Sequence, residues 1–133
     1  MGKILAVNDD GSMLFLLRMI LEEAHYQVDT ASGGEEALEK IHRDDFDLIV
    51  LDILMPQPNG FTVMKQLRSS PATASIPIIV LTALGDEASR QKAVEMGAQY
   101  FISKPFLIKD LVKRVEEVLD NQKAYSLTLP VAR

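Results

Sequence analysis

The sequence of 133 residues contains no cysteine. It therefore has no disulfide framework, no thiolate nucleophile and no zinc site built on sulfur, which suits a reducing compartment. A basic surface typical of nucleic-acid binding is also lacking, because the formal net charge is -5 at pH 7. No apolar stretch is long enough to span a membrane, and Met1-Gly2-Lys3 leads into a predicted strand rather than a signal peptide. We expect a cytoplasmic protein that binds neither a membrane nor, directly, nucleic acid.

The composition is that of a globular domain, with 47% hydrophobic and 25% charged residues. We expect one domain over residues 1–120 and a C-terminal tail or linker stub over residues 121–133, where the composition changes. Within this tail, Tyr125, Leu127, Leu129 and Val131 recur with a period of two. A strand that pairs with a neighbour is therefore the alternative to a disordered stub.

Short apolar runs in the sequence each end in polar residues. If the runs are parallel neighbouring strands, their carboxyl ends meet at one edge of a sheet, and the polar residues converge there. A carboxylate directly after a buried strand is costly unless it opens into a functional cleft, so Asp52 is predicted to be a reactive acid. The runs are Ile4-Leu5-Ala6-Val7 before Asn8-Asp9-Asp10, Leu48-Ile49-Val50-Leu51 before Asp52, Ile78-Ile79-Val80-Leu81 before Thr82, and Tyr100-Phe101-Ile102 before Ser103-Lys104.

Helical patterns alternate with these runs, which predicts an α/β fold of five strand-helix units around a parallel sheet. After a first helix capped by Ser12, residues 27–31 form a weaker strand candidate. Further helices are expected after Gly33-Gly34 and over residues 60–68, 86–96 and 107–119. The first helix is expected to bury Met13, Leu16, Leu17, Ile20 and Leu21.

The polar residues at this edge suit phosphoryl transfer. Asp9, Asp52 and, less directly, Asp10 offer hard oxygen ligands, which favour Mg²⁺. Lys104 adds a positive charge and Thr82 a hydroxyl donor. Phosphoryl transfer requires mainly positioning and charge neutralisation, and a carboxylate can itself be the nucleophile and form an aspartyl-phosphate.

Five motifs follow one another along the chain. They are Lys3-Ile4-Leu5-Ala6-Val7-Asn8-Asp9-Asp10, Asp47-Leu48-Ile49-Val50-Leu51-Asp52-Ile53-Leu54-Met55-Pro56, Pro56-Gln57-Pro58-Asn59-Gly60, Ile76-Pro77-Ile78-Ile79-Val80-Leu81-Thr82-Ala83 and Lys104-Pro105-Phe106. In this order and spacing they resemble the receiver (CheY-like) domain of bacterial two-component response regulators. The resemblance extends from Lys3 to about Leu119 and implies a doubly wound, flavodoxin-like sheet of strand order 2-1-3-4-5 with five flanking helices.

The resemblance implies roles for individual residues around Asp52. Asp52 would accept a phosphoryl group from a phosphohistidine on a sensor histidine kinase or a histidine phosphotransfer protein. Mg²⁺ would be bound by Asp9, Asp52 and the backbone carbonyl of Leu54. The family usually has two adjacent acids after the first strand, whereas this sequence has Asn8 as the first, so Asn8 would contact the metal through a water. Asp10 is expected to point elsewhere.

The resemblance also implies a conformational switch. Thr82 would hydrogen-bond the phosphoryl group, and Phe101 at the aromatic switch position would turn inward as Thr82 moves. Lys104 would pair with the phosphoryl group, and the Lys104-Pro105 bond is expected to be cis. Such a domain is not a conventional enzyme; it is a signalling domain that catalyses its own phosphorylation and dephosphorylation.

The implied partners are the kinase or phosphotransfer protein, a downstream output protein or domain, and a second copy of the chain in a homodimer. On the first helix, Leu14, Phe15 and Met19 exceed what the core needs and are expected to face outward. An apolar surplus beside the predicted site indicates an interface with the kinase.

Three other classes remain as alternatives. A haloacid-dehalogenase-type phosphatase also uses an aspartate nucleophile, but it needs an acid two residues later, where this sequence has Leu54. A pseudo-receiver would keep the fold without signalling through phosphate, and Asn8 is its only support. A flavodoxin would need a phosphate-binding loop rich in Ser, Thr and Gly after the first strand, which this sequence lacks.

Overall fold

A computed structural model describes the backbone of residues 2–132 and the side chains of residues 2–120. Strands and helices alternate along the whole described chain. The elements are β1 (Lys3–Val7), α1 (Gly11–Glu23), β2 (Gln27–Ala31), α2 (Gly34–Arg43), β3 (Leu48–Leu51), α3 (Gly60–Arg68), β4 (Ile78–Thr82), α4 (Glu87–Glu95), β5 (Tyr100–Ser103) and α5 (Ile108–Ala132).

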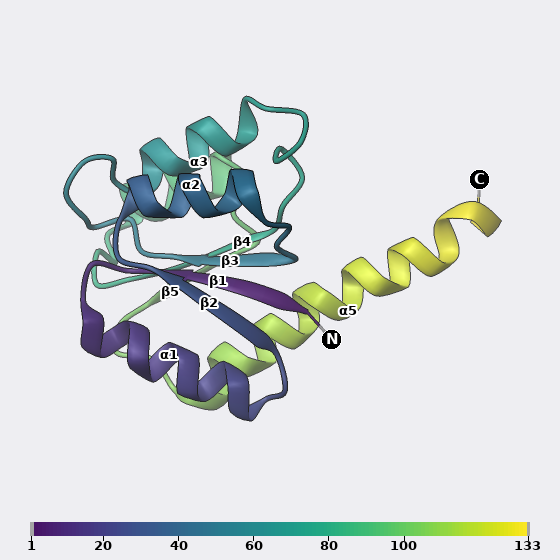
Figure 1. Cartoon of the computed structure of the whole chain (residues 1–133), viewed down its shortest axis with the longest axis horizontal. Helices are drawn as coiled ribbons and strands as arrows, with labels where there is room; N and C mark the ends of the chain where they lie inside the picture. Colours follow the sequence, from purple (N-terminus) through teal and green to yellow (C-terminus); the bar gives the residue numbers. More distant parts are fainter. Residues whose placement is uncertain (1, 133) are drawn as a thin grey trace.

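The strands form one parallel sheet of order β2-β1-β3-β4-β5. In Figure 1, α1 and α5 lie on one face of this sheet, and α2 and α3 lie on the other. The expected fold class and strand order are therefore confirmed.

Each face of the sheet has its own apolar core. Leu5, Ile49 and Val80 contribute to the core under α2, α3 and α4, whereas their chain neighbours Ile4 and Val50 face α1 and α5. Side chains alternate between the two faces of a strand, and the sheet is covered on both sides, so its central strands are continuously apolar. In these central strands polar residues occur only at the ends, whereas the edge strand β2 carries Asp29 and Thr30 within it, so the apolar central runs are what locate the functional edge.

The first helix differs from the sequence prediction in its cap and in its rotation about its axis. Asp10, not Ser12, caps α1, because its Oδ1 accepts hydrogen bonds from the backbone N–H groups of Ser12 at 2.9 Å and Met13 at 3.4 Å. Leu14 is buried, whereas Leu16, expected in the core, is 37% exposed. This helix has more apolar residues than one face can bury, so periodicity alone did not determine which of them point inward.

The middle helices follow the prediction. Asn59 caps α3 and Asp86 caps α4, each through a side-chain oxygen that accepts a backbone hydrogen bond. Gly97 follows the C-terminal end of α4 with a positive φ of 94°, a conformation that favours glycine at such an end.

The last helix is longer than predicted. α5 runs from Ile108 to Ala132, although the sequence pattern placed its end at Leu119. Residues 121–132 are thus helical rather than the expected disordered stub or the alternative strand, and α5 extends well beyond the sheet (Figure 1). No glycine or proline occurs between Ile108 and Leu129, so nothing before Pro130 interrupts the propagation of helical hydrogen bonds. The division into a domain over residues 1–120 and a tail stays a prediction.

None of the helices in the described part of the chain combines the length and the apolar character that crossing a membrane requires.

Candidate functional site

The carboxyl ends of four strands bring the predicted site residues to one edge of the sheet. Backbone hydrogen bonds fix the alignment: Asp52 N–H donates to Val7 O at 3.0 Å, and Lys104 N–H donates to Thr82 O at 2.9 Å. Asp52 therefore lies beside the end of β1, and Lys104 lies beside the end of β4. The convergence that the apolar runs predicted is present.

Asp52 is a buried carboxylate with a cation nearby. The residue is 5% exposed, and its Oδ1 accepts a hydrogen bond from the Leu54 backbone N–H at 3.0 Å. Its Oδ2 lies 3.7 Å from Lys104 Nζ, which is too long for a hydrogen bond but short enough for charge attraction in a partly buried site. The carboxylate is thus held in place on one oxygen and only loosely paired on the other.

The loop after β1 places its polar residues in three different environments. Asn8 is 1% exposed, and its Oδ1 accepts a hydrogen bond from Asp10 N–H at 2.9 Å. Asp9 is exposed. Asp10 is engaged in capping α1, so it points away from the site as expected.

These residues fit a Mg²⁺ ion. The site offers only hard oxygen donors, and Mg²⁺ commonly takes one or two carboxylates and completes its coordination with water. Among the side chains of residues 2–120, no group of three or more His, Cys, Asp or Glu is placed to bind a metal, so Asp9 and Asp52 would have to suffice as charged ligands. Asn8 Oδ1 accepts one backbone hydrogen bond, and its second lone pair could still accept one from a metal-bound water.

The predicted switch residues occupy the β4-β5 side of the edge. Thr82 is fully buried, and its Oγ1 accepts a hydrogen bond from Leu84 N–H at 3.2 Å. Phe101 is partly buried and packs against the core under α2, α3 and α4. The Thr82 hydroxyl thus contacts the loop that follows β4. Phe101 lies on the neighbouring strand β5, two residues before its end.

Three further predictions can be compared with the structure: the cis peptide bond before Pro105, the phosphatase alternative and the cap of α1. The Lys104-Pro105 peptide bond is cis, as expected, and Gln57-Pro58 is also cis, which the sequence did not predict. Leu54, at the position where a haloacid-dehalogenase-type phosphatase needs an acid, has a side chain that is 54% exposed and cannot act as a general acid. The capping role of Asp10 was missed, although an aspartate just before an apolar helix is a recognised cap signal.

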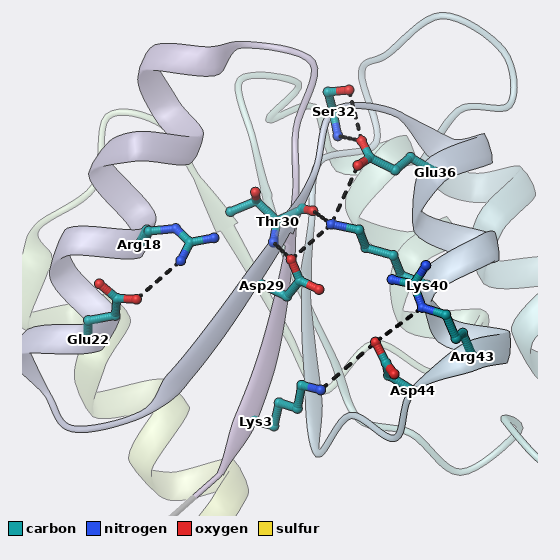
Figure 2. Close-up of polar contacts among 10 residues, drawn as sticks. All are labelled: Lys3, Arg18, Glu22, Asp29, Thr30, Ser32, Glu36, Lys40, Arg43 and Asp44. Carbon is teal, nitrogen blue, oxygen red and sulfur yellow. Dashed lines mark hydrogen bonds and ion pairs between the residues drawn. The ribbon is translucent and has the colours of Figure 1, made fainter.

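A second lysine-aspartate cluster lies away from this edge, on β2 and α2 (Figure 2). Lys40 Nζ donates to Asp29 Oδ1 at 2.9 Å and to Thr30 O at 2.7 Å, and lies 3.5 Å from Glu36 Oε2. Burial is the largest influence on Asp29 and opposes its ionisation, but the hydrogen bonds from Lys40 and from Thr30 N–H and the positive charges of Lys40 and Arg18 together hold the pKa of Asp29 below its ordinary value. The same hydrogen bond raises the pKa of Lys40. Sequence reasoning did not detect this cluster.

Comparisons with known proteins agree with the geometry. Residues 4–116 match the family model described as "Response regulator receiver domain". The transcriptional regulatory protein ResD of Bacillus subtilis is 44% identical over 117 residues, which cover 88% of this chain and 48% of that protein. CpxR of Escherichia coli is 40% identical over 119 residues, covering 90% of this chain and 50% of that protein. The chain thus spans about half the length of these curated relatives.

Solved structures give the same result. The chemotaxis protein CheY4 of Vibrio cholerae superposes with a TM-score of 0.84 at 35% identity, covering 90% of this chain and 99% of that one. A CheY-like receiver domain protein from Methanospirillum hungatei superposes with a TM-score of 0.86 at 29% identity, covering 92% and 96%. The chain belongs to the receiver domain family of two-component response regulators.

Proposed function

We propose that Asp52 is the phosphoacceptor of this receiver domain. The observation that carries the proposal is the position of its carboxylate, which is 5% exposed at the common edge of the sheet and has Lys104 Nζ 3.7 Å from Oδ2. A buried acid that is only loosely paired leaves one oxygen available to a reagent. Asp29, by contrast, is already hydrogen-bonded on Oδ1 by Lys40 and by its own strand.

The reaction transfers a phosphoryl group from a phosphohistidine to this oxygen. An Asp52 carboxylate oxygen forms a bond to phosphorus as the phosphorus-nitrogen bond breaks, and the imidazole leaves with the electron pair and takes up a proton. Acetyl phosphate can replace the phosphohistidine as donor, with acetate as the leaving group. Lys104 would then lie against the negative charge of the transferred group, which is the kind of electrostatic stabilisation that phosphoryl transfer uses.

Receiver domains use Mg²⁺ at the phosphorylation site, and here we propose that Asp9, Asp52 and the Leu54 backbone carbonyl bind it, with Asn8 contributing through a water. Bound Mg²⁺ supplies positive charge that lets the carboxylate and phosphoryl oxygens approach each other. Asn8 in place of an acid lowers the negative charge of the site by one unit, which weakens metal binding. Its side chain still offers an oxygen to a metal-bound water.

Phosphorylation would act on partners through Thr82 and Phe101. The phosphoryl group can shift a conformational equilibrium only by contacts that are better in one state, and we propose that the Thr82 hydroxyl and the Lys104 ammonium make these contacts. Thr82 Oγ1 would exchange its hydrogen bond from Leu84 N–H for the phosphoryl oxygen, and Phe101 would move with it. The face formed by α4, β5 and α5 would change as a result.

The partners proposed are a sensor histidine kinase or histidine phosphotransfer protein in the cytoplasm, a downstream output domain or protein, and a second copy of the chain. ResD and CpxR are named transcriptional regulatory proteins, so an output domain in the same polypeptide is one form of this arrangement. Phe15 is 67% exposed and Met19 is 53% exposed on α1, whereas Leu14, expected to join them, is buried. We place the kinase contact on Phe15 and Met19.

The test is the mass of the intact protein after incubation with acetyl phosphate. We expect one phosphoryl adduct on the wild-type chain in the presence of Mg²⁺, none after chelation, and none on Asp52→Asn. Persistence of the adduct on Asp52→Asn would refute the assignment of Asp52. Absence of any adduct on the wild-type chain with Mg²⁺ would instead support a pseudo-receiver.

A further inference from the structure

The loop that joins Asp52 to α3 is contacted closely by two glycines. Gly60, the first residue of α3, approaches the start of the loop so closely that a Cβ atom there would lie 2.6 Å from Asp52 O and 2.5 Å from Ile53 Cα. Gly34, the buried first residue of α2, approaches the end of the loop, where a Cβ atom would overlap Pro58 O and lie 2.8 Å from Pro58 Cγ. Real Cβ atoms do not make contacts this short, so neither position accepts a side chain without movement.

The neighbouring glycine shows that this constraint is local. A Cβ atom at Gly33 would meet nothing within 4 Å, although Gly33 is next to Gly34 in the chain. Gly33 has an extended backbone with φ of -175° and ψ of 177°, which any residue adopts. Gly34 itself lies in helix α2 and has no positive φ, so lack of space, and not backbone conformation, is what requires glycine there.

We infer that Gly34 is a positioning residue for the Asp52 site, an inference that rests on the function proposed above. By having no side chain, it lets the N-terminus of α2 close against the carbonyl of Pro58 and so fixes the far end of the loop that carries Leu54. The Leu54 backbone N–H donates to Asp52 Oδ1 at 3.0 Å, and its carbonyl is the proposed metal ligand. The position of α2 thereby helps to set the geometry of both the carboxylate and the metal site.

The surroundings leave an added methyl group no easy direction in which to displace its neighbours. The loop is anchored in the core by Ile53, which is 3% exposed, and by Met55, which is 8% exposed. Helix α2 is anchored in the same core by Ala37 and Ile41. The clash with Pro58 is with backbone, so it cannot be relieved by rotation of a side chain. We therefore expect the methyl group added at position 34 to displace part of the loop. Leu54 lies in this loop, between Ile53 and Met55.

The direct test compares Gly34→Ala with Gly33→Ala. In each variant and in the wild type, the Mg²⁺ concentration for half-maximal labelling by acetyl phosphate is measured, with direct Mg²⁺ binding by calorimetry and the folded fraction by circular dichroism. We expect Gly34→Ala to raise the half-maximal Mg²⁺ concentration and the Mg²⁺ dissociation constant about tenfold, with labelling recovered at saturating Mg²⁺. Gly33→Ala should stay within about twofold of the wild type.

The experiment distinguishes failure of the Gly34 inference from failure of the proposed function of Asp52. If the wild type is labelled at Asp52 but folded Gly34→Ala has an unchanged Mg²⁺ dependence, the positioning role is refuted and the proposed function stands. A lower plateau of labelling without a change in the half-maximal Mg²⁺ concentration would show a merely structural role and also refute it. If the wild type itself is not labelled at Asp52, the proposed function fails.

A measurement on the wild type covers the case in which Gly34→Ala does not fold. If the α2 contact strengthens Mg²⁺ binding, Mg²⁺ must strengthen the contact by the same factor. The Ala37 N–H, which donates to Gly33 O at 3.0 Å in the first turn of α2, should then exchange with solvent about tenfold more slowly when Mg²⁺ is bound. The Asp44 N–H, which donates to Lys40 O at 2.8 Å at the other end of α2, is the control and should not change. Equal slowing of both amides, or of neither, would contradict the inference.

Discussion

Two of the lysine-aspartate pairs in this domain are built differently. Lys40 and Asp29 form a hydrogen-bonded ion pair of 2.9 Å on the edge strand, where side chains remain partly exposed. Lys104 and Asp52 lie 3.7 Å apart at the carboxyl edge of the sheet, and Asp52 is 5% exposed. The Lys40–Asp29 pair, whose carboxylate is the more exposed, thus has the shorter distance between its charged atoms. The Lys104–Asp52 pair, whose carboxylate is buried, has the longer one.

On the function proposed above, the difference separates a structural pair from a functional one. Burying a charge is costly unless it is closely paired and hydrogen-bonded, so a stability requirement alone would have brought Lys104 and Asp52 together. Lys40 is engaged by Asp29, by Thr30 O and by Glu36, and Asp29 Oδ1 accepts hydrogen bonds from both Lys40 and Thr30 N–H. Under the proposed function, Asp52 Oδ2 and the Lys104 ammonium, which lie 3.7 Å apart, stay available to an incoming group.

Arg68 is a third cation for this comparison, and its guanidinium donates four hydrogen bonds to backbone oxygens. Burial lowers the pKa of Arg68, and its guanidinium joins the loop before β4 to the loop after α4. The acceptors are the backbone oxygens of Met96 at 3.2 Å, Ala74 at 2.9 Å, Ile76 at 2.9 Å and Gly97 at 3.0 Å.

Arg68→Ala should therefore lower the free energy of unfolding by about 3 kcal/mol, because charged hydrogen bonds to several carbonyls are lost together. Urea unfolding at neutral pH measures this. Arg18→Ala, which removes an exposed pair with Glu22, is the control and should change stability by less than about 0.5 kcal/mol. A change of similar size in both variants would show that Arg68 is an ordinary surface residue.

Removing the loosely paired cation should affect chemistry more than stability. Lys104→Met is expected to slow labelling of Asp52 by acetyl phosphate about tenfold, or ~1.4 kcal/mol in the barrier, because a charge next to the transferred group is lost. The labelling rate is followed by intact mass at saturating Mg²⁺. Lys40→Met is the matched control and should be labelled at the wild-type rate. Equal rates in all three proteins would remove Lys104 from the mechanism.

Asn8→Asp restores a second acid beside Asp9. It should tighten Mg²⁺ binding about tenfold, or ~1.4 kcal/mol, which is less than the Coulomb attraction alone because water separates the charges. The carboxylate can keep the hydrogen bond that Asn8 Oδ1 accepts from Asp10 N–H. Gln27→Glu adds the same charge at the opposite end of the sheet and should leave binding unchanged. The idea fails if a Mg²⁺ titration finds Asn8→Asp equal to or weaker than the wild type.

The Lys40 pair should contribute a small stability that depends on pH. The pKa of Asp29 is lowered by Lys40 despite burial, and the pKa of Glu36 is lowered chiefly by its hydrogen bond from Ser32 N–H. Groups with a depressed folded-state pKa stabilise the fold above their unfolded pKa, near 4, and lose that contribution as the pH falls through the folded value.

Lys40→Met should lower the free energy of unfolding by less than about 1 kcal/mol at neutral pH and flatten its decline between about pH 5 and pH 2. Urea unfolding across this range tests both. A slope unchanged from the wild type would mean that Lys40 does not set the pKa of Asp29.

The sequence allowed the fold and the meeting of site residues to be predicted, because apolar strands that end in polar residues encode the edge of a parallel sheet directly. It did not determine which apolar residues of α1 point inward, since Leu14 and Leu16 are chemically equivalent and only packing against the sheet chooses between them. The end of α5 was missed because the alternation after Asn121 competes with uninterrupted helix formation. The Lys40 cluster and the contact of Gly34 with Pro58 each join segments that are separate in the sequence, so no local sequence pattern predicts them.

The most direct test of the contrast between Asp52 and Asp29 locates the phosphoryl group on the chain. An acyl phosphate is reduced by borohydride to an alcohol, so a phosphorylated aspartate becomes homoserine, which peptide mass spectrometry identifies. After labelling with acetyl phosphate and Mg²⁺, we expect homoserine at position 52 alone, and none when Mg²⁺ is chelated. Homoserine at position 9, 10 or 29, or an equal amount at position 52 without Mg²⁺, would contradict the assignment of Asp52 as the one open, metal-dependent acceptor.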